Sequence, residues 1–102
     1  MDISARIKAD LDANPVKLYM KGSPSFPQCG FSKHVVDILA NYDVEFGSSN
    51  ILEDPEIRQG LKDYFDWPTF PMLVVNGELV GGCNIISELH ADGELADALK
   101  GE

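Results

Sequence analysis

The first half of the chain predicts two amphipathic helices and two strands. Its apolar residues recur at helical spacing in two segments and form short apolar or alternating runs in two others. Proline and glycine separate these segments, because neither residue continues a helix or a strand easily. The predicted helices cover residues 2–13, with Ile3, Ile7 and Leu11 on one face and Pro15 beyond the end, and the stretch from Phe31 to Tyr42; the predicted strands cover residues 16–20 and 44–50.

The second half predicts a helix, a hairpin and two short helices. Asp54 caps the first of these helices, and Pro55 takes its first position, where a missing N–H does no harm. Asn76-Gly77 joins two short strands, and this dipeptide is a strong signal for a two-residue hairpin turn. The strands cover residues 72–75 and 78–81, the Asp54 helix turns Ile57, Leu61, Tyr64 and Phe65 inward, and the last helices cover about 85–90 and 94–100.

This order of elements predicts an α/β fold. The first two strands and the helix between them form a right-handed parallel unit, and the hairpin adds an antiparallel pair. We therefore expect a four-stranded mixed β-sheet flanked by helices on both faces. The length suits a single domain over residues 1–102 with one modest core.

Composition and charge exclude several classes of function. The chain carries 17 acidic and 8 basic residues, for a net charge of −9. Binding to nucleic acid or to a membrane surface needs a basic footprint that this balance does not provide. No stretch is long enough to span a bilayer, and residues 1–14 do not form a signal or transit peptide, although a leader removed earlier would leave no trace. Together with only two cysteines, these features favour a reducing, cytoplasmic location.

Half of the basic residues are Lys21, Lys33, Arg58 and Lys62. Lys21 and Lys33 flank the segment that contains Cys29. Either the fold gathers these cations into one positive pocket on an acidic protein, or they are scattered solvated charges. Composition leaves both interpretations open.

Cys29 is the strongest candidate for chemistry. It lies between a loop and a predicted helix, where backbone N–H groups lack helical partners and the helix dipole adds positive potential. Both effects favour the thiolate, which attacks disulfides and binds metals. A dithiol redox loop would carry its second cysteine at position 32, and this chain has Ser32 there. The chain therefore has a reactive thiol without a resolving partner.

Two further motifs flank the predicted hairpin. Pro71 stands immediately before a strand, a position that an ordinary trans proline also suits. Gly81-Gly82, which precedes Cys83-Asn84, either lets backbone N–H groups approach a ligand or makes a plain left-handed turn. Each motif is weak when taken alone.

Taken in order, these motifs resemble the monothiol glutaredoxins of the Cys-Gly-Phe-Ser class. The resemblance covers essentially the whole chain, and it implies a thioredoxin-like fold with a cis peptide bond between Phe70 and Pro71. The matching segments are Met20-Lys21-Gly22-Ser23-Pro24, Cys29-Gly30-Phe31-Ser32, Trp67-Pro68-Thr69-Phe70-Pro71 and Gly77-Glu78-Leu79-Val80-Gly81-Gly82-Cys83.

The resemblance also implies a glutathione site beside Cys29, which would be the catalytic residue. Glutathione carries two carboxylates and one ammonium, so a cationic pocket on an acidic protein suits it. The implied contacts are Lys21 with one carboxylate, Arg58 and Lys62 near the glycine carboxylate, the Phe70 backbone at the cysteine moiety, the Gly82 and Cys83 backbones and the Asn84 side chain at the γ-glutamyl end, and Phe31, Thr69 and Pro71 as further glutathione-binding residues.

Asn84 departs from the pattern of this family. Members usually carry Asp at the equivalent position, where a carboxylate can pair with the glutathione ammonium. An amide oxygen still accepts a hydrogen bond, but the charge-assisted part is lost. We therefore predict weaker glutathione binding than in relatives with Asp.

The function implied by the resemblance is carriage of an iron–sulfur cluster. A 2Fe–2S cluster takes four sulfur ligands, and Cys29 from two chains with two glutathione thiols supplies four. We expect a cluster-bridged homodimer, with Cys29 as the only protein metal ligand, that passes clusters to apo iron–sulfur proteins or pairs with a BolA-like protein. The alternatives are a weak glutathione-dependent thiol–disulfide oxidoreductase and an iron- or redox-sensing adaptor.

The remaining distinctive residues have simpler interpretations. Cys83 either forms a disulfide or becomes glutathionylated, or is a small buried hydrophobe under the glycine turn, and we favour the second interpretation. His34 and His90 are expected to be solvated or capping residues. Trp67 is expected to pack against the loop before the hairpin, and Phe31 either shields a cluster or packs at the helix start.

Overall fold

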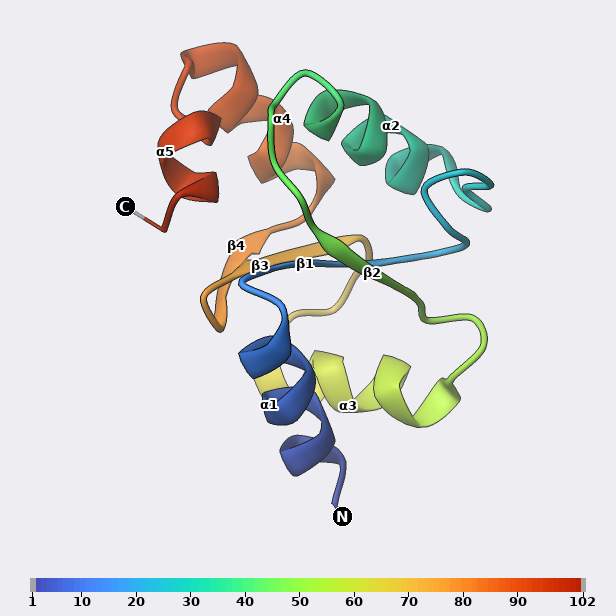
Figure 1. The fold of residues 1–102 in the computed structure, drawn as a ribbon. Helices are drawn as coiled ribbons and strands as arrows, with labels where there is room; N and C mark the ends of the chain where they lie inside the picture. Colours follow the sequence, from blue (N-terminus) through green and yellow to red (C-terminus); the bar gives the residue numbers. More distant parts are fainter. Residues whose placement is uncertain (1, 102) are drawn as a thin grey trace.

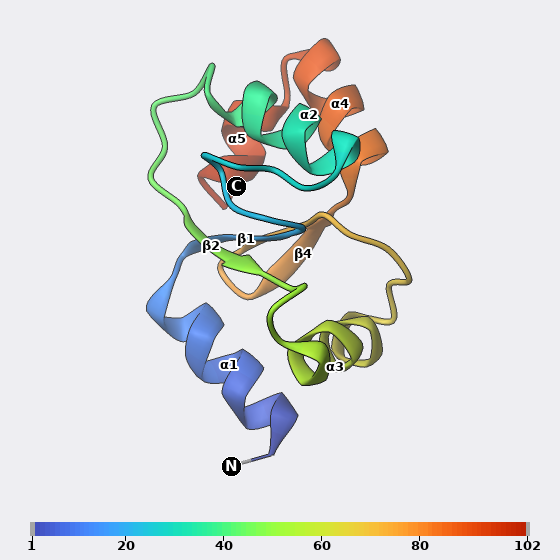
Figure 2. The same cartoon turned by 90° about the vertical axis from the view of Figure 1, so that its right-hand side faces the viewer.

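A computed structural model of the protein describes residues 2–101. One sheet lies between two layers of helices, with α1 and α3 on one face and α2, α4 and α5 on the other (Figure 1 and Figure 2). Within residues 2–101, no helix has both the length and the apolar character needed to cross a membrane. The elements are α1 (Ile3–Ala13), β1 (Val16–Met20), α2 (Gly30–Leu39), β2 (Gly47–Asn50), α3 (Pro55–Phe65), β3 (Met72–Val75), β4 (Glu78–Gly81), α4 (Cys83–Asp92) and α5 (Leu95–Leu99).

The sheet is mixed, as the sequence predicts. Its strands lie in the order β2-β1-β3-β4. β1 pairs in parallel with β2 and antiparallel with β3, and β3 pairs antiparallel with β4. β1 is therefore a central strand, and all its residues are buried.

The core has two halves, one on each face of the sheet. Leu18 and Met20 of β1 join a cluster with residues of α2, α4 and α5. Tyr19, between them, faces the other way and joins a cluster with residues of α1 and α3. The alternation of side chains along a strand thus divides the single core expected from the sequence into two.

The second predicted strand begins only at Gly47. Val44 and Phe46 precede it and pack against the α2-side core without joining the sheet, which explains their apolar alternation. Gly47 lies opposite Lys17, near the start of β1. Pro15, just before β1, has no N–H to donate, so the hydrogen-bonded pairing of β1 with β2 cannot extend far before Lys17 and Gly47.

Helix α2 ends earlier than its apolar pattern predicts. Its last residue is Leu39 rather than Tyr42. The Asn41 side-chain amide donates to the carbonyl oxygens of Asp37 and Ile38, which satisfies acceptors in the last turn. Tyr42 still packs against the core from outside the helix.

Helix α4 is longer than predicted, and α5 is shorter. α4 begins at Cys83, directly after Gly82, and ends at Asp92 because Gly93 adopts a left-handed φ of 76°. Glu94 caps α5 instead of starting it. The early start of α4 matters for the site, because it puts Cys83 in a first turn whose backbone N–H groups have no helical partner.

Candidate functional site

Cys29 lies where the loop after β1 enters α2. It is the N-cap residue of α2, its backbone is extended, and its side chain is half-buried. The thiol makes no capping hydrogen bond of ordinary geometry. The Ser32 backbone N–H nevertheless lowers the pKa of the Cys29 thiol, aided by the Phe31 N–H, the Lys21 ammonium and the Ser32 hydroxyl, while partial burial opposes the shift. The predicted position at a helix N-terminus is therefore confirmed.

Ser32 has a structural role at the position of the missing second thiol. Its side chain is fully buried. Its Oγ accepts a hydrogen bond from the Lys21 backbone N–H at 3.1 Å. Ser32 thus ties the first turn of α2 to the end of β1.

A cavity of about 540 Å³ opens beside Cys29. Its walls come from the end of β1, the start of α2, one face of α3, the loop before β3 and the start of α4. It contains every residue predicted for the site except Pro71, and it adds residues that the prediction omitted or assigned to packing. The lining residues are Lys21, Cys29, Phe31, Arg58, Lys62, Trp67, Pro68, Thr69, Phe70, Gly82, Cys83, Asn84 and Ile85.

The three cations of this cavity differ from most other basic residues in residues 2–101 in their lack of an acidic partner. Within residues 2–101, Lys21, Arg58 and Lys62 make no ion pair, whereas the basic residues outside the cavity that pair with carboxylates are Arg6, Lys8, Lys17 and Lys33. The fold therefore gathers three of the four cations singled out in the sequence. The fourth, Lys33, pairs with Asp37 on the exposed side of α2 and is a solvated charge.

The peptide bond between Phe70 and Pro71 is cis, as the resemblance implies. Phe70 lines the cavity. Pro71 is buried and does not line it. The expected direct contact of Pro71 with a ligand thus finds no support in the cavity lining.

The paired glycines allow β4 and α4 to approach each other closely. Gly81 has a φ of 147°, and a Cβ there would lie 2.8 Å from the Ile85 side chain. Gly82 is the N-cap residue of α4 and offers no side chain to cap it. Gly81 therefore has a positive φ that favours glycine, and the first-turn N–H groups of α4 have no helical partner. The approach of these N–H groups to a ligand stays a prediction.

Cys83 lies in the same cavity as Cys29. It is half-buried rather than buried, and it packs partly against the α2-side core. Both cysteines are free thiols. Trp67 is a packing residue, as expected, and it packs against the α1-side core, a cluster that includes Phe70 of the loop before β3. It also lines the cavity, and its buried indole Nε1 has no hydrogen-bond partner within residues 2–101.

The two histidines lie outside the cavity and are exposed, as predicted. His34 Nε2 is 3.0 Å from Ser87 Oγ, and His90 Nδ1 is 2.6 Å from Tyr42 Oη. These contacts join α2 and its C-terminal extension to α4. His90 therefore connects helices away from the site, whereas His34 also lines an adjoining hollow of about 520 Å³ with Cys29 and Cys83.

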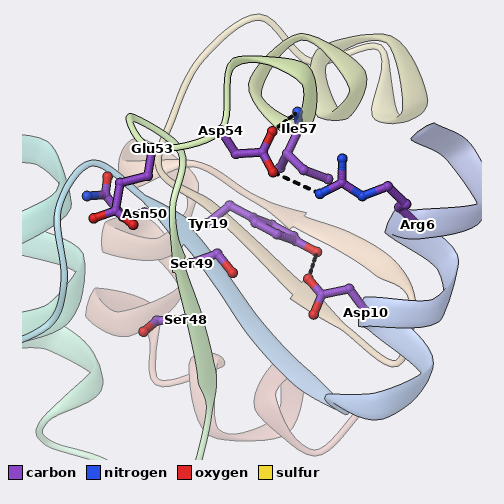
Figure 3. A pocket seen from close by; sticks show the side chains of 9 residues that line it. All are labelled: Arg6, Asp10, Tyr19, Ser48, Ser49, Asn50, Glu53, Asp54 and Ile57. Atoms are coloured by element: carbon purple, nitrogen blue, oxygen red, sulfur yellow. Dashed lines mark hydrogen bonds and ion pairs between the residues drawn. The ribbon is translucent and has the colours of Figure 1, made fainter. Parts of the chain in front are cut away.

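A second cavity, of about 590 Å³, lies between α1, β2 and α3 (Figure 3). Three of its four charged side chains, Arg6, Asp10 and Asp54, have polar or charged partners, and the fourth is Glu53. Arg6 Nη2 is 2.8 Å from Asp54 Oδ2, and the Tyr19 hydroxyl donates to Asp10 Oδ2 at 2.6 Å. The two cavities are of similar size, but this one is lined by no cysteine, so chemistry rather than size identifies the Cys29 cavity as the candidate site.

Comparisons with known sequences agree with the motifs. The glutaredoxin family profile matches residues 16–80. The chain is 50% identical over 99 residues to glutaredoxin 4 of Pasteurella multocida, covering 97% of this chain and 91% of that protein. It is 45% identical over 102 residues to the mitochondrial monothiol glutaredoxin-5 of Saccharomyces cerevisiae, covering 97% of this chain and 68% of that protein.

Some relatives are much longer than this chain. Monothiol glutaredoxin-S17 of Arabidopsis thaliana is 51% identical over 98 residues, which cover 96% of this chain and 20% of that protein. The match to monothiol glutaredoxin-S11 of Oryza sativa likewise covers 20% of that protein. The chain thus spans about a fifth of the length of these two curated relatives.

Solved structures confirm the thioredoxin-like fold that the resemblance implies. The solution structure of reduced poplar apo GrxS14 is 45% identical, has a TM-score of 0.84, and covers 96% of this chain and 90% of its own. A buckwheat glutaredoxin–glutathione complex has a TM-score of 0.79 at 19% identity, with 96% and 90% covered. This second likeness concerns the fold alone.

Proposed function

The chain belongs to the glutaredoxin family, as a monothiol member, and from this premise we propose that it binds glutathione beside Cys29 and carries a 2Fe–2S cluster. The observation that carries the proposal is a half-exposed thiol of lowered pKa in a cavity whose cations make no ion pair within residues 2–101. A thiolate is the form that ligates iron. Unpaired cations beside it suit a small thiol that carries carboxylates.

The cavity fits the charges of glutathione from one end to the other. Lys21 would meet one carboxylate, and Arg58 and Lys62 would lie near the glycine carboxylate. The free N–H groups at the start of α4 suit the carboxylate of the γ-glutamyl end, and Asn84 can accept from its ammonium. A buckwheat glutaredoxin of the same fold has been solved as a glutathione complex.

The number of sulfur ligands favours two chains per cluster. Within residues 2–101, no three His, Cys, Asp or Glu side chains gather closely enough to hold a metal ion. A 2Fe–2S cluster of the ferredoxin kind takes four sulfur ligands. Cys29 from each of two chains and the thiols of two glutathione molecules supply them, so the cluster is cargo shared in a homodimer.

Ligands that are not part of the protein also ease release of the cargo. Glutathione exchanges with solvent, so a cluster that it half ligates can pass to an apo iron–sulfur protein. The surface around the Cys29 cavity can also receive a BolA-like partner. A reducing compartment such as the cytoplasm would keep both ligand thiols available.

The half-exposed thiol with a lowered pKa also favours a second candidate function, which is monothiol disulfide exchange. The Cys29 thiolate would attack the glutathione sulfur of a mixed disulfide, forming a Cys29–glutathione disulfide and releasing the substrate thiolate. A second glutathione thiolate would then attack that bond, giving oxidised glutathione and regenerating the Cys29 thiolate. The buried Ser32 offers no second sulfur for a dithiol route.

Anaerobic reconstitution tests the proposal. The protein is loaded with iron, sulfide and glutathione, and its visible absorption and native mass are recorded. We expect a coloured dimer with two glutathione molecules that bleaches when glutathione is withdrawn. A colourless monomer that rapidly removes glutathione from a mixed disulfide would favour exchange instead.

The two cysteines provide a matched pair of variants. Cys29→Ser should abolish both loading and exchange, because it removes the only sulfur assigned as a ligand. Cys83→Ser should still load, because the assigned contact of that residue is its backbone. Loading by Cys29→Ser would show that the ligand has been misassigned.

A further inference from the structure

Asn50, the last residue of β2, makes hydrogen bonds to a segment of the Cys29 site. Its side-chain Oδ1 accepts from the Gly22 backbone N–H at 2.9 Å and from the Leu52 N–H at 3.0 Å. Gly22 is buried and directly follows Lys21. We propose that Asn50 is a positioning residue that holds the Lys21-Gly22 segment, and with it the Lys21 ammonium, at the edge of the cavity. This inference rests on the proposed function, in which Lys21 contacts glutathione.

The segment that Asn50 holds is also connected to the helix that bears the thiol. The Lys21 N–H donates to Ser32 Oγ at 3.1 Å, and the Lys21 carbonyl accepts from the Gln28 N–H at 2.8 Å. Ser32 lies in the first turn of α2, which Cys29 caps. Hydrogen bonds and backbone therefore run without a break from β2, through Gly22 and Lys21, to the start of α2.

The segment has little freedom to find another arrangement. Gly22 has a φ of 90°, and a Cβ there would collide with the backbone of Phe26 and of Gln28. An isolated bridge pairs Gly22 with Pro27 and closes the loop. Without the Asn50 acceptor, the Gly22 N–H would be buried and unpaired, so the segment would have to shift to reach water.

Asn50 also lines the second cavity, between α1, β2 and α3, but the Arg6 and Asp10 side chains there have other hydrogen-bond partners. In Figure 3 its side chain lies at the opposite end of the drawn residues from Arg6 and Asp10, whose polar groups have other partners. The neighbouring Ser49 lines the same cavity, and its hydroxyl makes no hydrogen bond to the Cys29 loop within the described part of the chain. Asn50 and Ser49 thus offer a matched comparison of adjacent polar residues.

The test compares wild type with Asn50→Leu, Asn50→Asp and Ser49→Ala in the full chain. Amide exchange at Gly22, the amide shifts of Lys21 and Cys29, and the glutathione dissociation constant are measured by NMR. In Asn50→Leu, we expect Gly22 exchange to rise about tenfold or more and the dissociation constant to rise about threefold or more, because the acceptor is lost. Asn50→Asp keeps an oxygen that accepts both N–H groups, so it and Ser49→Ala should stay within about twofold of wild type.

Each outcome decides the inference. Unchanged Gly22 exchange and glutathione affinity in a folded Asn50→Leu would overturn it, and so would equal losses in Asn50→Leu and Asn50→Asp. If Asn50→Leu does not fold, Asn50→Ser, whose hydroxyl is too short to reach Gly22, replaces it with the same expected results. If wild type binds no glutathione, the proposed function fails, while Gly22 exchange and the Lys21 shifts still decide the role of Asn50.

Discussion

At the scale of single residues, backbone amides act on the Cys29 thiol more strongly than nearby charge does. The Ser32 backbone N–H is the largest cause of the lowered thiol pKa, and the Lys21 ammonium contributes less. The protein thus activates its thiol through the start of α2. Lys21, whose position also depends on the loop after β1, adds to this effect and is available to bind an anion.

This order of causes predicts the pH dependence of Cys29 alkylation. The alkylation rate, followed by mass spectrometry of the Cys29 peptide, should have its midpoint below the ordinary thiol pKa of about 8.5. Lys21→Gln should raise the midpoint but leave it below the ordinary value, because the Ser32 amide remains. Lys33→Gln is the control, since Lys33 pairs with Asp37, and it should leave the midpoint unchanged. Loss of the whole shift in Lys21→Gln would reverse the order of causes.

Asn84 provides a second prediction at this scale. Asn84→Asp adds a carboxylate at the proposed ammonium site, and we expect glutathione to bind about fivefold more tightly, as a charge-assisted hydrogen bond replaces a neutral one. Isothermal titration calorimetry measures the change. Asn76→Asp adds the same charge in the hairpin turn, outside the cavity, and should have little effect. Equal affinities of wild type and Asn84→Asp would contradict the assignment.

Residue-level prediction placed ten of the eleven expected site residues on the wall of one cavity. The glycines and cysteines of the site were found because their segments match a family as whole strings. Ile85 was missed because it joins the cavity only through the early start of α4, which apolar spacing does not reveal. Lys33 lies as close to Cys29 in sequence as any cation, yet an Asp37 one helical turn away pairs with it.

At the scale of elements, α3 determines where two of the cations lie. Arg58 and Lys62 are one helical turn apart, so they share the face that lines the cavity. Asp54 is the N-cap residue of the helix, and its Oδ1 accepts from the Ile57 N–H. That N–H, with Arg6 as a second cause, lowers the pKa of the Asp54 carboxyl.

The cap of α3 predicts an acid-dependent contribution to stability. Because the folded-state pKa of Asp54 is depressed, its contribution is present above the unfolded carboxyl value of about 3.9 and is lost as pH falls through the lower folded value. Asp54→Asn should therefore lower the melting temperature by a few degrees at pH 7, and the difference from wild type should shrink toward pH 2. Asp63→Asn, on the exposed side of the same helix, is the control. A difference that persists undiminished at pH 2 would contradict this role.

The elements differ in how far local sequence determines them. The hairpin was predictable, because Asn76 and Gly77 have the positive φ values of 51° and 81° that their two-residue turn requires. The start of β2 was not, because it depends on where β1 begins and so on a partner strand distant in sequence. Local patterns thus predict which elements exist, while their ends depend on the residues they meet after folding.

At the scale of the whole molecule, the net charge of −9 opposes the proposed pairing of two chains. Raising the ionic strength from about 0.01 M to about 0.15 M shortens the screening length from about 30 Å to about 8 Å. We therefore expect added salt to strengthen the cluster-bridged dimer, measured by sedimentation, and to weaken glutathione binding to the cationic cavity. A dimer that weakens with salt would indicate that attraction between opposite charges holds it together.

The positions of the two chain ends leave the Cys29 site accessible. The start of α1 and the end of α5 lie away from the loop that leads into α2 (Figure 1). Additional polypeptide joined at either end would therefore not cover the opening of the Cys29 cavity. In two relatives, a segment similar to this chain makes up about a fifth of a much longer polypeptide.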